Sequence, residues 1–268
     1  RDLHSFPTRR SSDLIGSGRK RHSYIACEKF LQNLQTLGNV EYEIVRLSEY
    51  NLGICKGCRI CFDKGEEDCP YRDDRDKLIG KMNDSDGVIF ASPNYSFQVS
   101  GLMKVFLDRL GFGFHRPGFF GKTFTSIVVQ GIGKGEGIVK YLDFVGKGLG
   151  FNVVKGCCLK TLEPMTEKSQ QKFDRSIEIQ SKKFYAQLIK KEFPVPTLWW
   201  LMIFRMARTS MYKMLDESCR DYTYFRDKGW FESDYFYPVK LNPFKKLSGK
   251  IRSEERRVGK EGRSRRSP

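Results

Sequence analysis

Four cysteines lie within fifteen residues of this chain, at Cys55, Cys58, Cys61 and Cys69, and Pro70 follows the last of them. The pattern is C-x2-C-x2-C-x7-C-P. Only a few chemistries use four thiolates so close together: a [4Fe–4S] cluster, a structural zinc ion, or thiol redox chemistry. The remaining alternative is a cysteine-bearing loop that binds nothing.

The spacing of these cysteines favours a cluster over zinc but does not decide between a cluster and a bare loop. Three cysteines in two consecutive C-x2-C steps, followed by a Cys-Pro, are typical of bacterial [4Fe–4S] sites, although the last gap there is three residues instead of seven. Zinc ribbons usually separate two C-x2-C pairs by a longer stretch. Because the long gap precedes Cys69, we expect Cys69 to be the missing ligand if one of the four thiolates does not bind the metal. The other cysteines fit no ligand spacing, and we expect them to be buried, inert thiols: Cys27, Cys157, Cys158 and Cys219.

Two further segments have residue types suited to ligand binding. Residues 15–23, Ile-Gly-Ser-Gly-Arg-Lys-Arg-His-Ser, combine small residues with hydroxyl and guanidinium donors before an expected helix. Such a turn can bind an anion, although an ordinary strand-to-helix turn has the same composition. Residues 92–97, Ser-Pro-Asn-Tyr-Ser-Phe, follow a short apolar run. Tyr95 and Phe97 there either contact a flat ring ligand or cover the core.

The elements that must position these segments alternate along the chain. Apolar runs and helical periodicity predict strands at 42–47, 88–91, 124–129 and 151–155, and helices at 24–37, 73–82, 100–110, 138–149 and 166–191. This alternation predicts a parallel sheet with helices on both faces, and such sheets bind ligands at the carboxyl ends of their strands.

The two ends of the chain are expected to lie outside this fold. Residues 1–14 and 252–268 resemble translated sequencing adapter. The first strand should precede Gly16, so we expect this internal strand to be damaged. The predicted organisation is a domain at 15–192 with the cysteine segment at 53–72, followed by an extension at 193–251.

Composition excludes some classes of protein. The formal net charge is +16, but no nucleic-acid-binding motif accompanies it, and we expect no nucleic acid partner. No run of eighteen apolar residues predicts a spanning helix, and eight cysteines without a signal peptide indicate reduced thiols in the cytoplasm. In the extension, the apolar stretch 199–215 and the aromatic stretch 221–246 predict packing on the core or on a second copy; contact with a membrane surface is the weaker alternative.

The motifs together resemble the NADPH-dependent FMN reductase family and, within it, the iron–sulfur flavoproteins. The resemblance rests on G-S-G-R-K-x-x-S from Gly16, S-P-N-Y from Ser92, and S-G-x-x-K-x-F-x-D-R ending at Arg109, with the cysteine segment between. It implies a flavodoxin-like, doubly wound, five-stranded parallel sheet. It also implies bound FMN, with the phosphate on Ser17, Arg19 and Ser23, the ring and ribityl chain on Pro93, Asn94, Tyr95, Ser96 and Phe97, and the far edge of the ring near Gly131.

The function implied by this resemblance is oxidation of NAD(P)H through FMN, with transfer of the electrons to a small-molecule or protein acceptor. The cofactor would supply the chemistry, so we predict no catalytic side chain. The alternative is an electron-transfer protein that combines FMN with a [4Fe–4S] cluster on Cys55, Cys58, Cys61 and Cys69. We expect a homo-oligomer, as a dimer through the aromatic extension.

Overall fold

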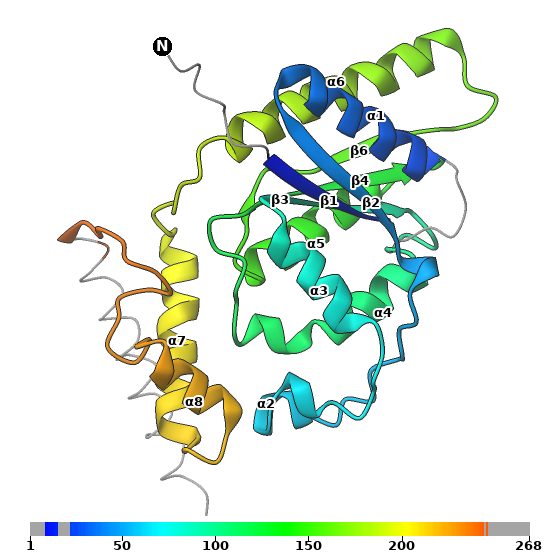
Figure 1. The fold of residues 1–268 in the computed structure, drawn as a ribbon. Coiled ribbons are helices and arrows are strands. Elements are labelled where there is room, and N and C mark those ends of the chain that lie inside the picture. Colours follow the sequence, from blue (N-terminus) through cyan, green and yellow to red (C-terminus); the bar gives the residue numbers. More distant parts are fainter. Residues whose placement is uncertain (1–8, 16–21, 244, 246–268) are drawn as a thin grey trace, which may run out of the picture. The chain divides into compact units, whose positions relative to one another are not determined.

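The computed structural model describes residues 9–15, 22–243 and 245, with only the backbone described for 9–15. Residues 9–58 and 71–192 belong to one compact unit, unit 1, built around a parallel sheet (Figure 1). Its strands lie in the order β2-β1-β3-β4-β5, and β6 also pairs with β4. All pairings are parallel, and the order 2-1-3-4-5 is that of doubly wound flavodoxin-like sheets.

The sheet consists of β1 (Arg9–Ile15), β2 (Val40–Arg46), β3 (Gly87–Pro93), β4 (Thr123–Gln130), β5 (Asn152–Val153) and β6 (Cys157–Lys160). The expected damage to the first strand is wrong, because β1 pairs along its length with β2 and also with β3. Ladder hydrogen bonds join backbone groups that every residue except proline carries, so side-chain identity does not prevent this pairing. That residues 1–14 are adapter sequence stays a prediction.

The expected strand at 151–155 is shorter than predicted, and a sixth strand follows it. β5 pairs with the start of β4 at Thr123 and Phe124, and β6 pairs with its end, from Ile127 to Gln130. The two short strands therefore succeed one another along one edge of β4. The predicted count of five strands is therefore wrong, because the described residues form a sheet of six.

Helices cover both faces of this sheet, as the alternation predicts (Figure 1). On one face lie α1 (His22–Leu37) and α6 (Glu167–Leu188), and on the other α3 (Arg75–Asp84), α4 (Gly101–Arg109) and α5 (Gly135–Gly148). Successive side chains of β3 supply the two cores in turn: Val88 and Phe90 pack with α3, α4 and α5, whereas Ile89 and Ala91 pack with α1 and α6. Both sides of β3 and β4 are buried, so these strands form the centre of the unit.

Capping residues fix where two of these helices begin. The Ser100 hydroxyl accepts a hydrogen bond from the backbone N–H of Met103, and the Thr166 hydroxyl accepts one from Ser169. Such N-caps satisfy backbone donors that a helix leaves unpaired in its first turn. The predicted starts at Ser100 and Thr166 are thereby confirmed as cap positions. Short 3₁₀ helices follow β2 (Leu47–Glu49) and α4 (Gly111–Phe114).

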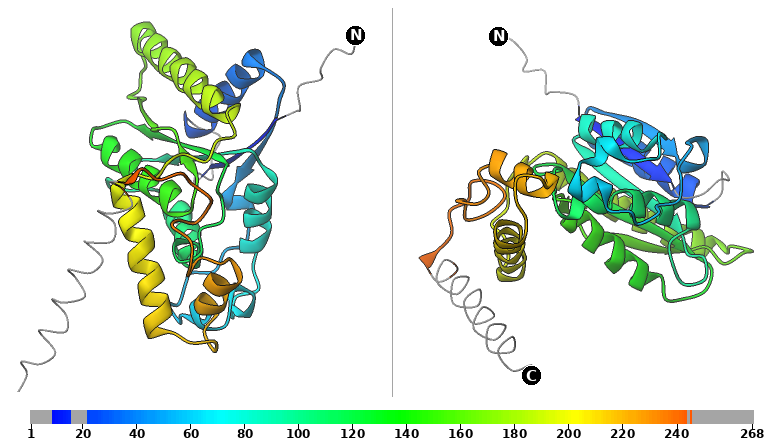
Figure 2. Two further views of the ribbon diagram at one scale, coloured as in Figure 1. Left: turned by 90° about the vertical axis from the view of Figure 1, so that its left-hand side faces the viewer. Right: turned by 90° about the horizontal axis from the view of Figure 1, so that it is seen from below.

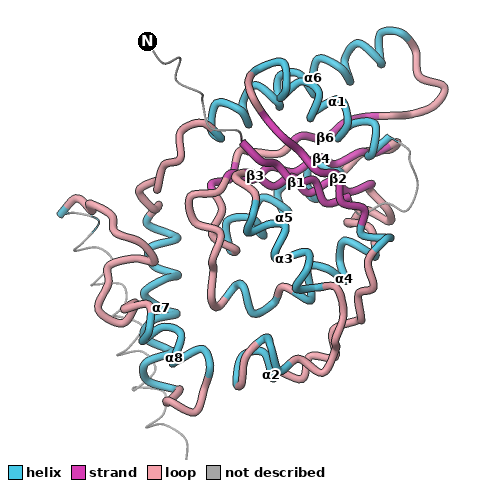
Figure 3. The backbone as a smooth tube through the Cα atoms, in the orientation of Figure 1, coloured by secondary structure: helices cyan, strands magenta, loops and turns pink. Residues whose placement is uncertain are grey.

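Residues 59–70, 193–243 and 245 belong to a second compact unit, unit 2. It contains α2 (Ile60–Asp63), a 3₁₀ turn (Glu66–Asp68), α7 (Leu198–Met214) and α8 (Arg220–Asp227). Figure 2 shows α7 as the long helix of this unit and Figure 3 shows the loops that flank α2. Phe204 of α7 packs edge-on against Tyr235 and Phe236, so the aromatic stretch forms much of the core of this unit. No helix among the described residues is long and apolar enough to cross a membrane.

Candidate functional site

The candidate site lies at the carboxyl edge of the sheet in unit 1. Because the strands are parallel, the loops after β3, β4 and β6 all leave from this edge, and α1 begins there after residues 16–21, which lie outside the described residues. The order of winding reverses between β1 and β3, which is where open α/β sheets bind ligands.

The loop after β3, residues 94–100, forms a tight turn that presents two aromatic rings. Tyr95 and Gln98 exchange backbone hydrogen bonds of 3.0 and 2.9 Å, with Ser96 and Phe97 between them at φ of 49° and 62°. Positive φ is uncommon for residues with a side chain, and such strained positions cluster at ligand sites. The turn leaves Tyr95 and Phe97 59% and 60% exposed, so neither ring covers the core.

A second set of contacts ties this loop to the glycine turn after β4, residues 131–134. The Asn94 side chain donates from Nδ2 to Gln130 Oε1 at 3.4 Å and to the Gly133 carbonyl at 3.3 Å. Gln130 Oε1 also accepts from the backbone N–H of Gly135 at 2.7 Å, where α5 begins. Lys134 Nζ lies 5.3 Å from the centre of the Phe97 ring. The loops after β3 and β4 are therefore joined by polar and cation–π contacts.

The loop after β6 reaches the start of α1. Thr161 donates its backbone N–H to Gln130, and Glu163 Oε1 lies 2.6 Å from His22 Nε2 in the first turn of α1. Ser23, the next residue, is buried. Three loops and the amino end of one helix thus border the same edge.

The structure brings together part of the predicted binding set. Asn94, Tyr95, Ser96, Phe97 and Gly131 lie on the loops after β3 and β4, Pro93 is the last residue of β3, and Ser23 lies at the start of α1. Ser17 and Arg19 lie outside the described residues. Sequence reasoning missed Gln130 and Lys134. The signal for Gln130 was present, since a lone amide ends the otherwise apolar run Ile-Val-Val.

The four cysteines of the predicted metal site divide between the two units. Cys55 and Cys58 are exposed in unit 1, whereas Cys61 is half-buried and Cys69 buried in unit 2. Within the described residues, no three His, Cys, Asp or Glu side chains gather as a metal site. A cluster on these cysteines therefore stays a prediction without support from the geometry.

Hydrogen bonds within unit 1 join the residues before the cysteine segment to the residues after it. The backbone N–H of Asn51 donates to Asp74 at 2.8 Å, and that of Gly53 donates to Asp73 at 2.9 Å. The Tyr71 ring packs so closely on Gly53 that an added Cβ there would lie 2.6 Å from it. The residues that flank the cysteines in the chain are thus held side by side by hydrogen bonds and packing.

The two cysteines of β6 have thiols with raised pKa values. Burial raises the pKa of the Cys157 thiol to about 12 and that of Cys158 to about 11. Cys157 packs toward α1 and α6, and Cys158 packs toward the opposite face. The prediction that these four cysteines are buried is confirmed for Cys27 and Cys219 and is wrong for Cys157 and Cys158, which are half-buried; that the thiols are inert stays a prediction.

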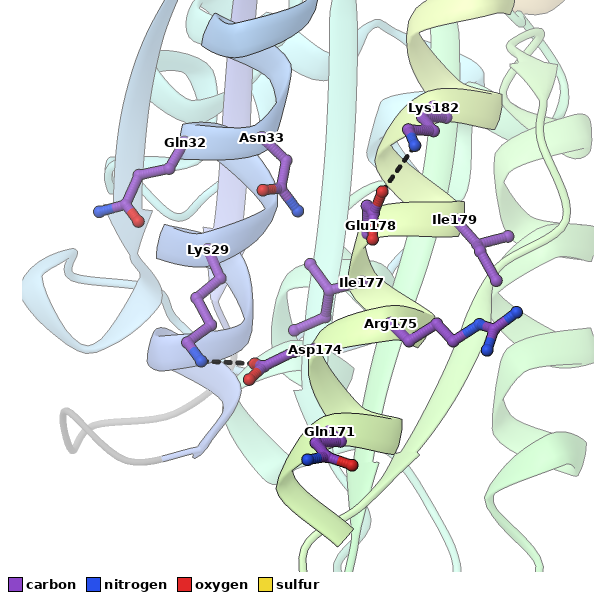
Figure 4. A pocket seen from close by; sticks show the side chains of 10 residues that line it. All are labelled: Lys29, Gln32, Asn33, Gln171, Asp174, Arg175, Ile177, Glu178, Ile179 and Lys182. Atoms are coloured by element: carbon purple, nitrogen blue, oxygen red, sulfur yellow. Dashed lines mark hydrogen bonds and ion pairs between the residues drawn. The ribbon is translucent and has the colours of Figure 1, made fainter. Parts of the chain in front are cut away.

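A separate pocket of about 900 Å³ lies between α1 and α6 (Figure 4). Its charged groups are largely paired with one another, Lys29 with Asp174 and Lys182 with Glu178. The hydrogen bonds from Lys29 and Gln170 outweigh burial and hold the pKa of Asp174 below its usual value. The pocket belongs to the helix layer and takes no residue from the loops after β3 and β4.

The sequence model of the NADPH-dependent FMN reductase family matches residues 14–160, more than half of the chain and all of the loops after β3 and β4. The chain belongs to this family. An iron–sulfur flavoprotein of Archaeoglobus fulgidus is 40% identical over 157 residues, 53% of this chain and 69% of the relative. An iron–sulfur flavoprotein of Clostridioides difficile is 31% identical over 160 residues, 58% of this chain and 68% of the relative.

Solved structures share the fold of this FMN reductase family member. RosB with bound 8-demethyl-8-formylriboflavin-5′-phosphate matches 88% of this chain and 92% of its own, with a TM-score of 0.53 and 13% identity. An azoreductase from Bacillus anthracis matches 66% of this chain and 99% of its own, with a TM-score of 0.53 and 17% identity. Family and fold make the chain a flavin-dependent oxidoreductase with a flavodoxin-like sheet.

The residues at the carboxyl edge fit a flavin. Asn94 Oδ1 is buried and finds no hydrogen-bond partner among the described residues. Beside it stand the exposed rings of Tyr95 and Phe97, which offer flat apolar surface. A planar, partly apolar ligand with hydrogen-bond donors would use both features.

Proposed function

We propose that this protein is an FMN-dependent oxidoreductase that takes electrons from NADH or NADPH and passes them to a small-molecule or protein acceptor. The observation that carries the proposal is the family match over residues 14–160, because it spans the loops after β3 and β4 at the carboxyl edge. A bound flavin would accept a hydride and release its electrons to the acceptor. A cytoplasmic location and assembly into a dimer are part of the same proposal.

The chain's own residues would bind the flavin and orient it. Ser23 and the first turn of α1 would meet the phosphate, together with Ser17 and Arg19 as the family resemblance implies. Tyr95 and Phe97 would contact the ring, and Asn94 and Gln130 would hold the loops after β3 and β4 in register. No described side chain is needed as a nucleophile.

The test is steady-state oxidation of NADH and NADPH by the purified, FMN-loaded chain, with a quinone and with ferric iron as acceptors. We expect turnover by the FMN-loaded chain and none by the same chain stripped of FMN. The absence of a measurable rate with both nucleotides, in protein that binds FMN, would contradict the NAD(P)H-dependent reaction while leaving flavin binding intact.

A second candidate is an electron-transfer protein that pairs FMN with an iron–sulfur cluster. It is favoured by the spacing of Cys55, Cys58, Cys61 and Cys69 and by relatives named iron–sulfur flavoproteins. Anaerobic purification followed by iron analysis and a visible spectrum tests it. Flavin absorption without iron would contradict this second candidate function, whereas about four irons per chain would support it.

A further inference from the structure

The outward face of α7 in unit 2 is apolar. The buried apolar residues of this helix lie on one side of it: Leu201, Phe204 and Met211. On the opposite side, apolar residues recur at intervals of three and four: Trp199, Met202, Ile203 and Met206. Trp199 is 56% exposed, and Met206 is exposed as well. A helix at the surface of a unit normally carries polar residues on its outward face, so this stripe indicates a surface that binds an apolar partner.

More exposed apolar side chains flank this stripe. They lie just before α7 and at its two ends: Phe193, Val195, Leu198, Tyr212 and Met214. Lys245 Nζ donates to the Pro196 carbonyl at 2.9 Å, which places the end of residues 235–245 against the start of α7. We call the described residues of 193–215 and 235–245 the α7 surface.

The charged residues of unit 2 are divided between the α7 surface and the rest of the unit. The α7 surface carries five cations and no carboxylate: Arg205, Arg208, Lys213, Lys240 and Lys245. Residues 59–70 and 216–234 carry ten carboxylates and five cations. The apolar stripe of α7 therefore belongs to the cationic part of the unit, and a cationic surface attracts an anionic partner.

Two of the five cations have partners within the unit. Arg205 is buried and lies 3.7 Å from Asp234, and Arg208 donates to a backbone carbonyl at 2.7 Å. Lys213 and Lys240 are exposed, and neither forms an ion pair with another residue that the structure describes. The ammonium groups of these two lysines are therefore placed to meet an anion outside the unit.

We propose that the α7 surface binds anionic lipid headgroups, with α7 in the plane of a membrane surface and Trp199 and Met206 at the boundary between headgroups and acyl chains. An apolar helix face bordered by cations is typical of interfacial helices, and tryptophan suits this boundary because its ring is apolar and its N–H is polar. A second copy is a poorer match, because two α7 surfaces would bring cations together with no carboxylate to pair them. The inference is independent of the proposed function.

The test measures how strongly the full chain binds lipid vesicles, by co-sedimentation. Vesicles of phosphatidylcholine and phosphatidylglycerol in equal parts are compared with vesicles of phosphatidylcholine alone. The wild-type chain should bind the anionic vesicles about 10-fold or more tightly than the neutral ones, and added salt should reduce this preference because it screens the charges. Lys213→Gln combined with Lys240→Gln should weaken binding to the anionic vesicles about 5-fold for each lysine removed.

A second variant separates insertion of apolar side chains from attraction between charges. Trp199→Ser combined with Met206→Ser keeps the net charge and should weaken binding to the anionic vesicles about 10-fold, because the apolar side chains no longer enter the bilayer boundary. The matched control is Ile179→Ser combined with Lys172→Gln, which removes an exposed apolar residue and an exposed lysine from α6 in unit 1 and should change binding little. Every changed side chain is exposed, so all variants should keep the urea midpoint of the wild type.

Three results would overturn the inference. The first is a wild-type chain that does not bind the anionic vesicles at low salt, or that binds anionic and neutral vesicles equally. The second is binding that the α6 control weakens as much as the α7 variants do, which would be attraction through the overall charge. The third is a wild-type chain without vesicle binding whose light-scattering mass falls to that of one chain in Trp199→Ser with Met206→Ser, which would assign the α7 surface to a second copy.

Discussion

Asp73 and Arg109 form a buried ion pair that joins the cysteine segment to the end of α4. The Arg109 guanidinium donates from Nη2 to both carboxylate oxygens, at 3.0 and 3.1 Å, and the two side chains are only 3% and 5% exposed. Asp73 also accepts from the backbone N–H groups of Gly53 and Arg75. The last residue of the S-G-x-x-K-x-F-x-D-R motif thus anchors the base of the segment that carries Cys55 and Cys58.

Replacing Asp73 by asparagine should therefore destabilise the protein strongly. The change leaves the Arg109 charge buried without its anion, and the loss of one partner of a buried pair costs about 3–5 kcal/mol. The measurement is the free energy of unfolding in urea at pH 7. Asp108→Asn is the matched control, because Asp108 pairs with Lys104 and both of these side chains are about half exposed, and it should change stability little.

The same pair gives an acid-dependent signature. Burial alone raises the pKa of Asp73, but the hydrogen bonds from Gly53, Arg109 and Arg75 outweigh it and hold the pKa below its usual value. A lowered carboxyl pKa contributes stability that is present above the unfolded value of about 3.9 and is lost as the pH falls through the folded value. The difference between wild type and Asp73→Asn should shrink below pH 4; a constant difference would contradict this assignment.

Much of the fold follows from the sequence, because local patterns determine it. The caps at Ser100 and Thr166 and the apolar runs of β3 and β4 are readable directly. Asp73 and Asp74 show the limit: next to an expected helix, their carboxylates suggest favourable charges at its amino end. In the structure Asp73 does accept from the first backbone N–H of α3, at Arg75, but the two carboxylates also accept from Gly53 and Asn51, twenty or more residues away. Such long-range partners leave no periodic signal.

The candidate site, too, could be predicted from the sequence only in part. The loop after β3 was recognisable from Pro93, Tyr95 and Phe97. These residues end the apolar run that is typical of a buried strand. The tie from Asn94 to Gln130 spans thirty-six residues and depends on how two parallel strands align. Register is set by packing across the whole sheet, so the sequence alone does not determine which loop residues meet.

Asp143 should give a pH dependence of the opposite sign. Burial raises the pKa of this α5 carboxyl, even though it accepts hydrogen bonds from Gly156 and Ser126. A raised carboxyl pKa contributes stability that is fully present below the unfolded value of about 3.9 and is lost as the pH rises through the folded value. Asp143→Asn should therefore gain stability relative to wild type between pH 4 and pH 7, measured as urea midpoints.

The control for this prediction is Asp174→Asn, whose carboxyl has a lowered pKa. Its midpoint relative to wild type should move in the other direction, falling as the pH rises through the lowered folded pKa to about 4 and staying level above that. If the midpoints of both variants changed with pH in the same direction, the overall charge of the protein, and not the pKa of these two carboxyls, would control the pH dependence.

Two glycines provide a matched test of packing. A Cβ at Gly156, between β5 and β6, would lie 2.0 Å from Ser126 Oγ and 2.6 Å from the Ser126 carbonyl oxygen, whereas one at Gly80 in α3 meets nothing within 4 Å. Gly156→Ala should lower the free energy of unfolding by about 1–3 kcal/mol through overpacking. Gly80→Ala should raise it by about 0.5–1 kcal/mol through helix propensity.

The eight thiols should separate into reactive and unreactive groups. Thiolate is the nucleophilic form, so at pH 8 a thiol with a pKa of about 11 is ionised in about one molecule in a thousand. Cys157, with its pKa of about 12, should react more slowly still. In metal-free protein, iodoacetamide should therefore label the exposed Cys55 and Cys58 well before this pair, as peptide mass spectrometry would measure.

Labelling in urea provides the reference, because unfolding should bring Cys157 and Cys158 to the rate of Cys55 and Cys58. Folded protein in which Cys158 reacts as fast as Cys55 would contradict the assignment of an inert pair. Since Cys157 and Cys158 pack toward opposite faces of the sheet, slow labelling would also exclude them as a readily oxidised dithiol. Thiol chemistry on the described part of unit 1 would then be confined to Cys55 and Cys58, at the anchored base of the cysteine segment.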